Sequence, residues 1–285
     1  MAAYFPSPGS LTTTCDDPDT IQYYVNAAHA ALVVADPLPS IATSLPLNST
    51  ASMSLLCSCV SRGPNFHTCS RGLDVAAPLI RSSLRRLALA WLRDSSKAEA
   101  DEFAVHLRCG DILQYRHHTE YGFSRYHVYK DVIPSGVGSI GIFSAPTDGV
   151  RCRGRDCNHL KTCGALVEDL RRFLADEFKG AIVVVRNGTA DDRIVETYAR
   201  MVLAKGVFCN PSTFCLYPTV ASTGVGYLVD SPGLYPWARE LPRKSVGEEK
   251  GFVLVEEPFL NMRMIVDGGM TAARIIEWLR TPRRG

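Results

Sequence analysis

A histidine and an arginine lie two residues apart at the end of an apolar segment. The segment reads FAVHLRCGDIL over residues 103 to 113 and contains His106, Arg108 and Gly110. Side chains alternate between the two faces of a β-strand, so His106 and Arg108 are expected on the same face. A guanidinium is a planar, two-pronged donor that suits phosphate oxygens, and Gly110 permits a sharp turn after it. The pattern favours an anion site at the end of a strand.

A second polar cluster follows another apolar segment, VFCNPSTFC, over residues 207 to 215. Asn210 is expected to cap a helix that starts at the next residue, which places Ser212 and Thr213 in its first turn. A helix amino terminus attracts anions through its dipole and its free N–H groups. Each segment alone also fits a structural role, as a hydrogen-bonded pair or a simple cap. Together with Arg108 they predict a metal-independent diphosphate site.

The elements that must position these residues alternate along the chain. Apolar segments typical of buried strands occupy residues 103–107, 139–143, 181–185, 206–209 and 225–229, and helical patterns occupy residues 163–178, 191–204 and 271–279. Alternation of apolar strands and helices predicts an α/β fold, a Rossmann-like parallel sheet with flanking helices and right-handed crossovers. Ligands of such sheets bind beyond the carboxyl ends of the strands, where the crossovers diverge.

Composition bounds the organisation and the partners. The 285 residues carry a formal charge of +2, which favours neither a nucleic-acid partner nor a membrane surface. Residues 1 to 100 are predicted to form a small, partly irregular N-terminal region that is possibly truncated, and residues 101 to 285 a Rossmann-like domain. A helix is expected after Pro78, with Leu84 and Trp91 on its apolar face.

The chain has ten cysteines, which favours disulfides over zinc because paired C-x2-C knuckles are missing. Two glycosylation sequons, at Asn48 and Asn187, fit a lumenal chain. No apolar run reaches the ~18 residues of a membrane span, and the first residues do not resemble a signal peptide. We therefore expect the Golgi or ER lumen, with an anchor or signal that this sequence does not contain.

The two polar segments resemble motifs of the GDP-fucose-dependent fucosyltransferase superfamily, which includes α1,2-, α1,6- and protein O-fucosyltransferases. VHLRCGDIL resembles its His-x-Arg-x-Gly-Asp motif, and GVFCNPSTFCLYPTVAS, about a hundred residues later, is similar to its Ser/Thr-rich segment. The resemblance covers roughly residues 100 to 240. It implies a GT-B-like enzyme that transfers fucose from GDP-fucose to a glycan or protein hydroxyl, with inversion and without metal or cofactor. The N-terminal region would then lie on the acceptor side.

The resemblance also implies residue roles. Arg108 would contact the β-phosphate and stabilise the departing GDP, since leaving-group charge must be neutralised. His106 would bind the nucleotide or orient Arg108. The remaining substrate-binding residues would be Gly110, Ser212, Thr213 and Phe214, together with an acidic residue that reads guanine. Asp192, Asp191 and Glu196 are the candidates for that acidic residue, and Asp191 or Asp192 equally suits a helix cap.

The catalytic base stays open between two carboxylates. Glu120 follows the motif on an expected loop and suits removal of the acceptor proton, while Asp111 serves equally well as a turn residue. His117 and His118 stand near Glu120, but adjacent histidines face apart, so no metal site is predicted. Two other functions remain open: a noncatalytic nucleotide- or carbohydrate-binding member of the same fold, and a transferase that uses another nucleotide sugar.

Overall fold

The computed structural model describes residues 84–86, 88–93, 100–114, 120–144, 158–187, 193–232, 234 and 252–282. Residues Asp74–Gly285 belong to one compact unit. Most of the region expected at residues 1 to 100 lies outside the described residues, so the domain boundary at residue 100 stays a prediction.

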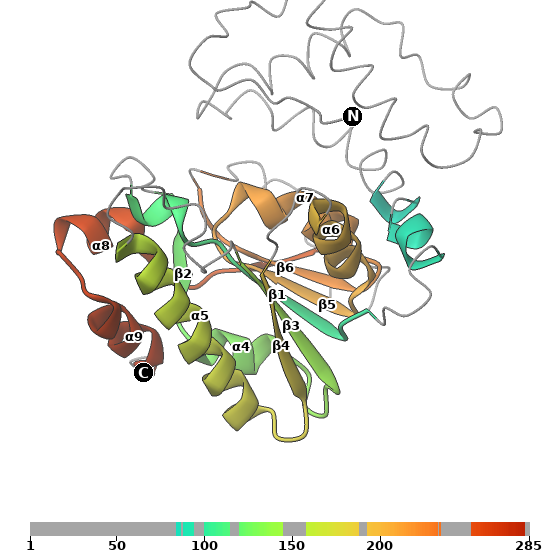
Figure 1. Ribbon diagram of the computed structural model, residues 1–285, viewed down its shortest axis with the longest axis horizontal. Coiled ribbons are helices and arrows are strands. Elements are labelled where there is room, and N and C mark those ends of the chain that lie inside the picture. The colour runs from blue at the N-terminus through green and yellow to red at the C-terminus, as the bar shows by residue number, and fades with distance from the viewer. Residues whose placement is uncertain are drawn as a thin grey trace, which may run out of the picture. The chain divides into compact units, whose positions relative to one another are not determined.

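A parallel sheet forms the centre of the described unit (Figure 1). Its six strands follow the order β4-β3-β1-β5-β6-β7, and every neighbouring pair is parallel. The strands are β1 (Phe103–Leu107), β3 (Ser139–Ser144), β4 (Ile182–Asn187), β5 (Gly206–Cys209), β6 (Val225–Val229) and β7 (Phe252–Val255). The chain builds outward on one side of β1 and then on the other, as in Rossmann-like sheets. The predicted α/β class with a Rossmann-like parallel sheet is confirmed.

Helices cover both faces of this sheet (Figure 1). On one face lie α4 (His127–Val132), α5 (Asn158–Glu177), α8 (Met262–Asp267) and α9 (Ala272–Arg280), which enclose the main apolar core. On the other face, α6 (Arg193–Leu203) and α7 (Thr213–Ala221) pack against each other. Helical residues 84–86 and 88–93 join that second layer, where Leu84 and Trp91 pack on Ala199 and Ala221. The apolar face predicted after Pro78 is confirmed for these two side chains.

Strand β1 sends alternate side chains into the two layers, as its sequence predicts. Val105 and Leu107 belong to the main core with α5, and both are buried. His106 faces the other layer, where its ring stacks on Phe214 of α7 with the ring centroids 5.2 Å apart. Both faces of β1 are therefore covered, and its carboxyl end is the part that can meet a ligand.

A separate, two-stranded antiparallel ribbon lies near that end. It pairs β2 (Gly122–Ser124) with β8 (Phe259–Asn261). Gly122 is required there, because a Cβ at this position would overlap the carbonyl oxygen of Leu260. The ribbon ties residues just after the first motif to the last third of the chain.

Candidate functional site

The first motif and the Ser/Thr segment meet at the centre of the sheet. Strands are added on one side of this point first and on the other side later in the chain. Strands β1 and β5 are neighbours, with His106 paired to Cys209, and the crossovers from these two strands lead to opposite sides of the sheet. This is the topological switch point, at which ligands of doubly wound sheets bind. Both predicted segments lie at the carboxyl ends of these two strands.

Arg108 is the first residue beyond β1. Its side chain contacts an aromatic ring, and the residue that follows it is fixed by a disulfide. Its Cζ lies 5.0 Å from the ring centroid of Tyr121. The next residue, Cys109, forms a disulfide with Cys163 of α5, with the two Cα atoms 5.5 Å apart. Gly110 then takes a φ of 83°, and the chain turns into the short 3-10 helix η3 (Asp111–Gln114). The expected turn at Gly110 is confirmed.

Asn210 has a different role from the helix cap that its sequence suggests. Its side chain is fully buried, and its Nδ2 donates to the carbonyl oxygen of His106 (2.9 Å) and to Tyr129 Oη (3.0 Å). Its Oδ1 accepts from the backbone N–H of Ser124 (3.0 Å). Asn210 therefore joins the ends of β1, β2 and β5, because buried backbone groups at these ends need partners. The predicted cap at Asn210 is wrong.

Ser212 is the actual N-cap of α7. It has extended backbone angles (φ −163°, ψ 133°), and its Oγ accepts from the backbone N–H of Phe214 at 3.1 Å. Helix α7 therefore begins at Thr213, later than expected, and the Ser212 hydroxyl is engaged in the cap. A disulfide between Cys209 and Cys215, with Cα atoms 5.6 Å apart, closes the loop that carries these residues.

His106 is 5% exposed and lies between the strand end and α7. Burial, together with the nearby charge of Arg108, lowers the pKa of His106 to about 3, so its imidazole is neutral at physiological pH. Its Nδ1 is buried without a hydrogen-bond partner among the described residues. Phe214 is fixed on its other side by Tyr198, whose hydroxyl donates to the Phe214 carbonyl oxygen at 3.0 Å.

The remaining predicted residues divide into those that the structure describes and those that it does not. Glu120 is described: its carbonyl oxygen accepts from Ser231 Oγ at 3.0 Å, which joins its loop to the end of β6. Glu196 forms an ion pair with Arg200 at 2.9 Å. For Asp111 and Thr213 only the backbone is described. Residues outside the described part are Asp191, Asp192, His117 and His118.

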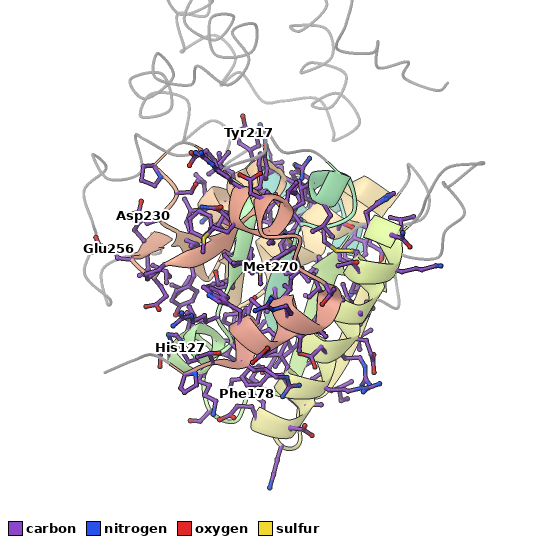
Figure 2. The ribbon with its side chains drawn as sticks, turned by 90° about the vertical axis from the view of Figure 1, so that its left-hand side faces the viewer. His127, Phe178, Tyr217, Asp230, Glu256 and Met270 are labelled. Carbon is purple, nitrogen blue, oxygen red and sulfur yellow. A yellow bond between two sulfur atoms is a disulfide. The ribbon has the colours of Figure 1, made fainter. Side chains whose placement is uncertain are left out.

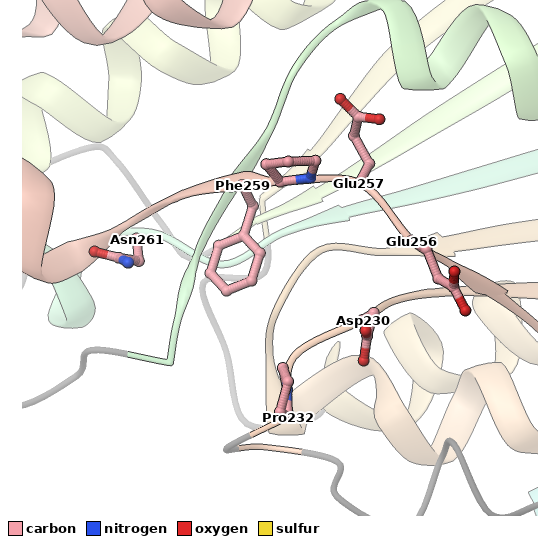
Figure 3. A pocket seen from close by; sticks show the side chains of 7 residues that line it. Asp230, Pro232, Glu256, Glu257, Phe259 and Asn261 are labelled. Atoms are coloured by element: carbon pink, nitrogen blue, oxygen red, sulfur yellow. The ribbon is translucent and has the colours of Figure 1, made fainter.

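An acidic pocket that the sequence analysis missed lies at the carboxyl ends of β6 and β7. Its volume is about 610 Å³, and Asp230, Glu256, Phe259 and Asn261 line it together with Glu257 and two prolines. Figure 2 shows Asp230 and Glu256 side by side, and Figure 3 shows the Glu257 carboxylate turned away from both. The adjacent glutamates after an apolar strand were the available signal. Its carboxylates disfavour phosphate groups, so the pocket does not suit the diphosphate that the two polar segments predict.

Comparisons with family models, with curated proteins and with solved structures find no match to this chain. Among the described residues, no three His, Cys, Asp or Glu side chains are grouped so that they could hold a metal ion. No helix in the described part of the chain is long and apolar enough to cross a membrane. The fold thus defines the class, a Rossmann-like α/β protein, and its two described disulfides are compatible with a secretory or lumenal protein.

Proposed function

We propose that the protein is a lumenal glycosyltransferase that moves fucose from GDP-fucose to a glycan or protein hydroxyl. Its described unit would be the nucleotide-sugar-binding half of a GT-B-like enzyme, and residues 1 to 100 would serve the acceptor. Neither a metal nor a cofactor takes part in the proposed reaction. The Golgi or ER lumen is the compartment that fits the disulfides and the sugar donor.

One observation carries the proposal: the stacking of His106 on Phe214, with ring centroids 5.2 Å apart. It brings the His-x-Arg motif beside the amino terminus of α7, although about a hundred residues separate them in sequence. Their meeting point is the switch point between β1 and β5, where nucleotide ligands of this fold class bind. Arg108 and the start of α7 can then meet the same diphosphate.

The proposed mechanism concentrates on the leaving group. As the bond from the fucose anomeric carbon to the β-phosphate oxygen breaks, negative charge grows on GDP. The Arg108 guanidinium and the helix amino terminus at Thr213 neutralise that charge from fixed positions, which lowers the barrier more than mobile water does. His106 is neutral, so it acts as a hydrogen-bonding and packing group and leaves the positive charge to Arg108.

The acceptor hydroxyl must lose a proton as it attacks. Glu120 is the proposed base, with Asp111 as the alternative, and Asp192 is the proposed reader of the guanine edge. The Glu120 carbonyl oxygen is hydrogen-bonded to Ser231, which fixes the backbone of its loop near the ends of the strands. A carboxylate in hydrogen-bond reach of the attacking hydroxyl is sufficient for this role.

The first experiment measures GDP and GDP-fucose binding by calorimetry without divalent ions. Replacing Arg108 by Ala should weaken binding well over tenfold, because losing a charge-assisted contact costs about 2–4 kcal/mol. Arg172→Ala is the matched control, since it removes the same charge from a side chain on α5 that is 66% exposed. Equal binding by the wild type and Arg108→Ala, or no binding by the folded wild type, would contradict the proposal.

Turnover separates the enzyme from a noncatalytic binding protein of the same fold. Both would bind GDP, but only the enzyme releases GDP from GDP-fucose when an acceptor is added. A transferase that uses another nucleotide sugar would bind that donor at least as tightly as it binds GDP-fucose.

A further inference from the structure

We propose that Tyr121 is a positioning residue that orients the Arg108 guanidinium toward the donor diphosphate. The identity of that ligand rests on the proposed function, whereas the positioning itself concerns two residues of this chain. Neither the motif segments nor the resemblance assigns Tyr121 a role.

The contact between the two side chains joins a cation to an aromatic ring. Arg108 Cζ lies 5.0 Å from the Tyr121 ring centroid, within the range of a cation–π interaction. A ring at this distance attracts the cation through its π-face, and it limits the directions that a long arginine side chain can take. Tyr121 therefore restricts where the guanidinium points.

Tyr121 is itself anchored on both sides in the sequence. Its carbonyl oxygen accepts from the backbone N–H of Met262 at 3.0 Å. The preceding residue, Glu120, accepts from Ser231 Oγ, and the following residue, Gly122, pairs with Asn261 in the β2–β8 ribbon. The ring thus stands on a backbone that is held by β8 and by the end of β6, so it is a fixed support for Arg108.

Arg108 is also close to the aromatic residues that pack around Phe214. Its charge is among the causes that lower the pKa of His106, and it opposes the effect of burial on the pKa of Tyr198. The guanidinium therefore contacts Tyr121 and lies near His106 and Tyr198, which both pack on Phe214. A long, flexible arginine side chain loses rotamer entropy when it binds a ligand, and a ring that restricts it in advance strengthens that binding.

The test compares Tyr121→Phe, Tyr121→Leu and Tyr121→Met in the full chain. Phe keeps the ring and should bind GDP within about twofold of the wild type, whereas Leu and Met should bind it about five- to thirtyfold more weakly. Binding of guanosine, which has no phosphate, should stay unchanged in all three variants. In the unliganded protein, NMR relaxation of the Arg108 Nε–H group should show an ordered side chain in the wild type and Tyr121→Phe, and a mobile one in the other two.

The matched control is Trp278→Leu, which removes a second cation–π contact, with Arg125 at 4.5 Å, from another part of the unit. It should leave Arg108 relaxation and GDP binding unchanged. An ordered Arg108 in folded Tyr121→Leu or Tyr121→Met would overturn the positioning role, even if GDP binds as proposed. Failure of the wild type to bind GDP would instead overturn the proposed function, and the relaxation measurement would still decide the role of Tyr121.

Discussion

Asn210→Ala is the substitution that most directly tests how the switch point is held together. The Asn210 side chain makes three hydrogen bonds, with the His106 carbonyl oxygen, Tyr129 Oη and the Ser124 backbone N–H, and it is fully buried. Alanine removes all three at once. It leaves the buried Ser124 N–H in particular without its hydrogen-bond partner.

The magnitude follows from these contacts. Each lost hydrogen bond is worth about 1 kcal/mol, and a buried group left unsatisfied adds about 1–3 kcal/mol. We therefore expect Asn210→Ala to lower the free energy of unfolding by about 4–6 kcal/mol, a large share of the stability of a domain of this size. The backbone hydrogen bond from Asn210 N to the His106 carbonyl oxygen at 3.4 Å remains, so that oxygen keeps one partner.

Equilibrium unfolding in urea, followed by circular dichroism, measures the loss. Tyr129→Phe is the control, because it removes a single one of the three bonds and should cost about 1 kcal/mol. The double variant should lose less than the sum of the two single losses, since both remove the same bond. A loss below about 1 kcal/mol for Asn210→Ala would refute the reasoning, because the bonds at the strand ends would then contribute almost nothing.

Two further predictions concern the same cluster. Because burial lowers the pKa of His106 to about 3 from 6.5, the unfolded chain binds a proton that the native protein does not, and stability should fall as the pH drops from 6.5 toward 3. Within this range the stability should fall by about 1.4 kcal/mol per pH unit. Unfolding experiments on the wild type and His106→Phe at pH 7 and pH 4.5 measure this loss as the difference between the two proteins. The same pH dependence in both proteins would contradict the prediction. Replacing both Cys209 and Cys215 by Ala should lower the free energy of unfolding by roughly 2 kcal/mol, which thermal unfolding measures. The same change should weaken GDP binding, which calorimetry measures. Unchanged GDP binding would show that this disulfide does not shape the proposed site.

The sequence predicted the central strands well because they are short apolar segments with clear ends. The predicted bounds of β1, β5 and β6 agree with the structure. Parallel central strands are buried on both faces, so each is a continuous apolar run. Such a run can be recognised in the sequence without knowing which strand it pairs with. The ribbon of β2 and β8 was not predicted, because three-residue strands have too little pattern to distinguish them from loops.

The contacts around the candidate site could be predicted only in part from the sequence. Arg108 and Phe214 lie in recognisable motifs, whereas the role of Asn210 depends on partners far along the chain, and the contact of Tyr121 with Arg108 depends on how the intervening loop folds. A local pattern such as Asn-Pro-Ser-Thr fits a helix cap equally well at Asn210 or Ser212. Only the fold decides, since it brings buried carbonyl and N–H groups from two other strands to Asn210.

The residue after Arg108 bears on the proposed diphosphate site, in which Arg108 is the proposed cation. In the resembling family a second basic residue is common at that position, whereas this chain has Cys109, which forms a disulfide with Cys163. This disulfide fixes the backbone next to Arg108, and the Cys209–Cys215 disulfide fixes the loop before α7. With fewer charges, binding of a diphosphate at the proposed site would depend less on long-range attraction and more on the geometry of Arg108 and the start of α7. That is why the ring of Tyr121, which carries no charge, is expected to matter for binding an anion.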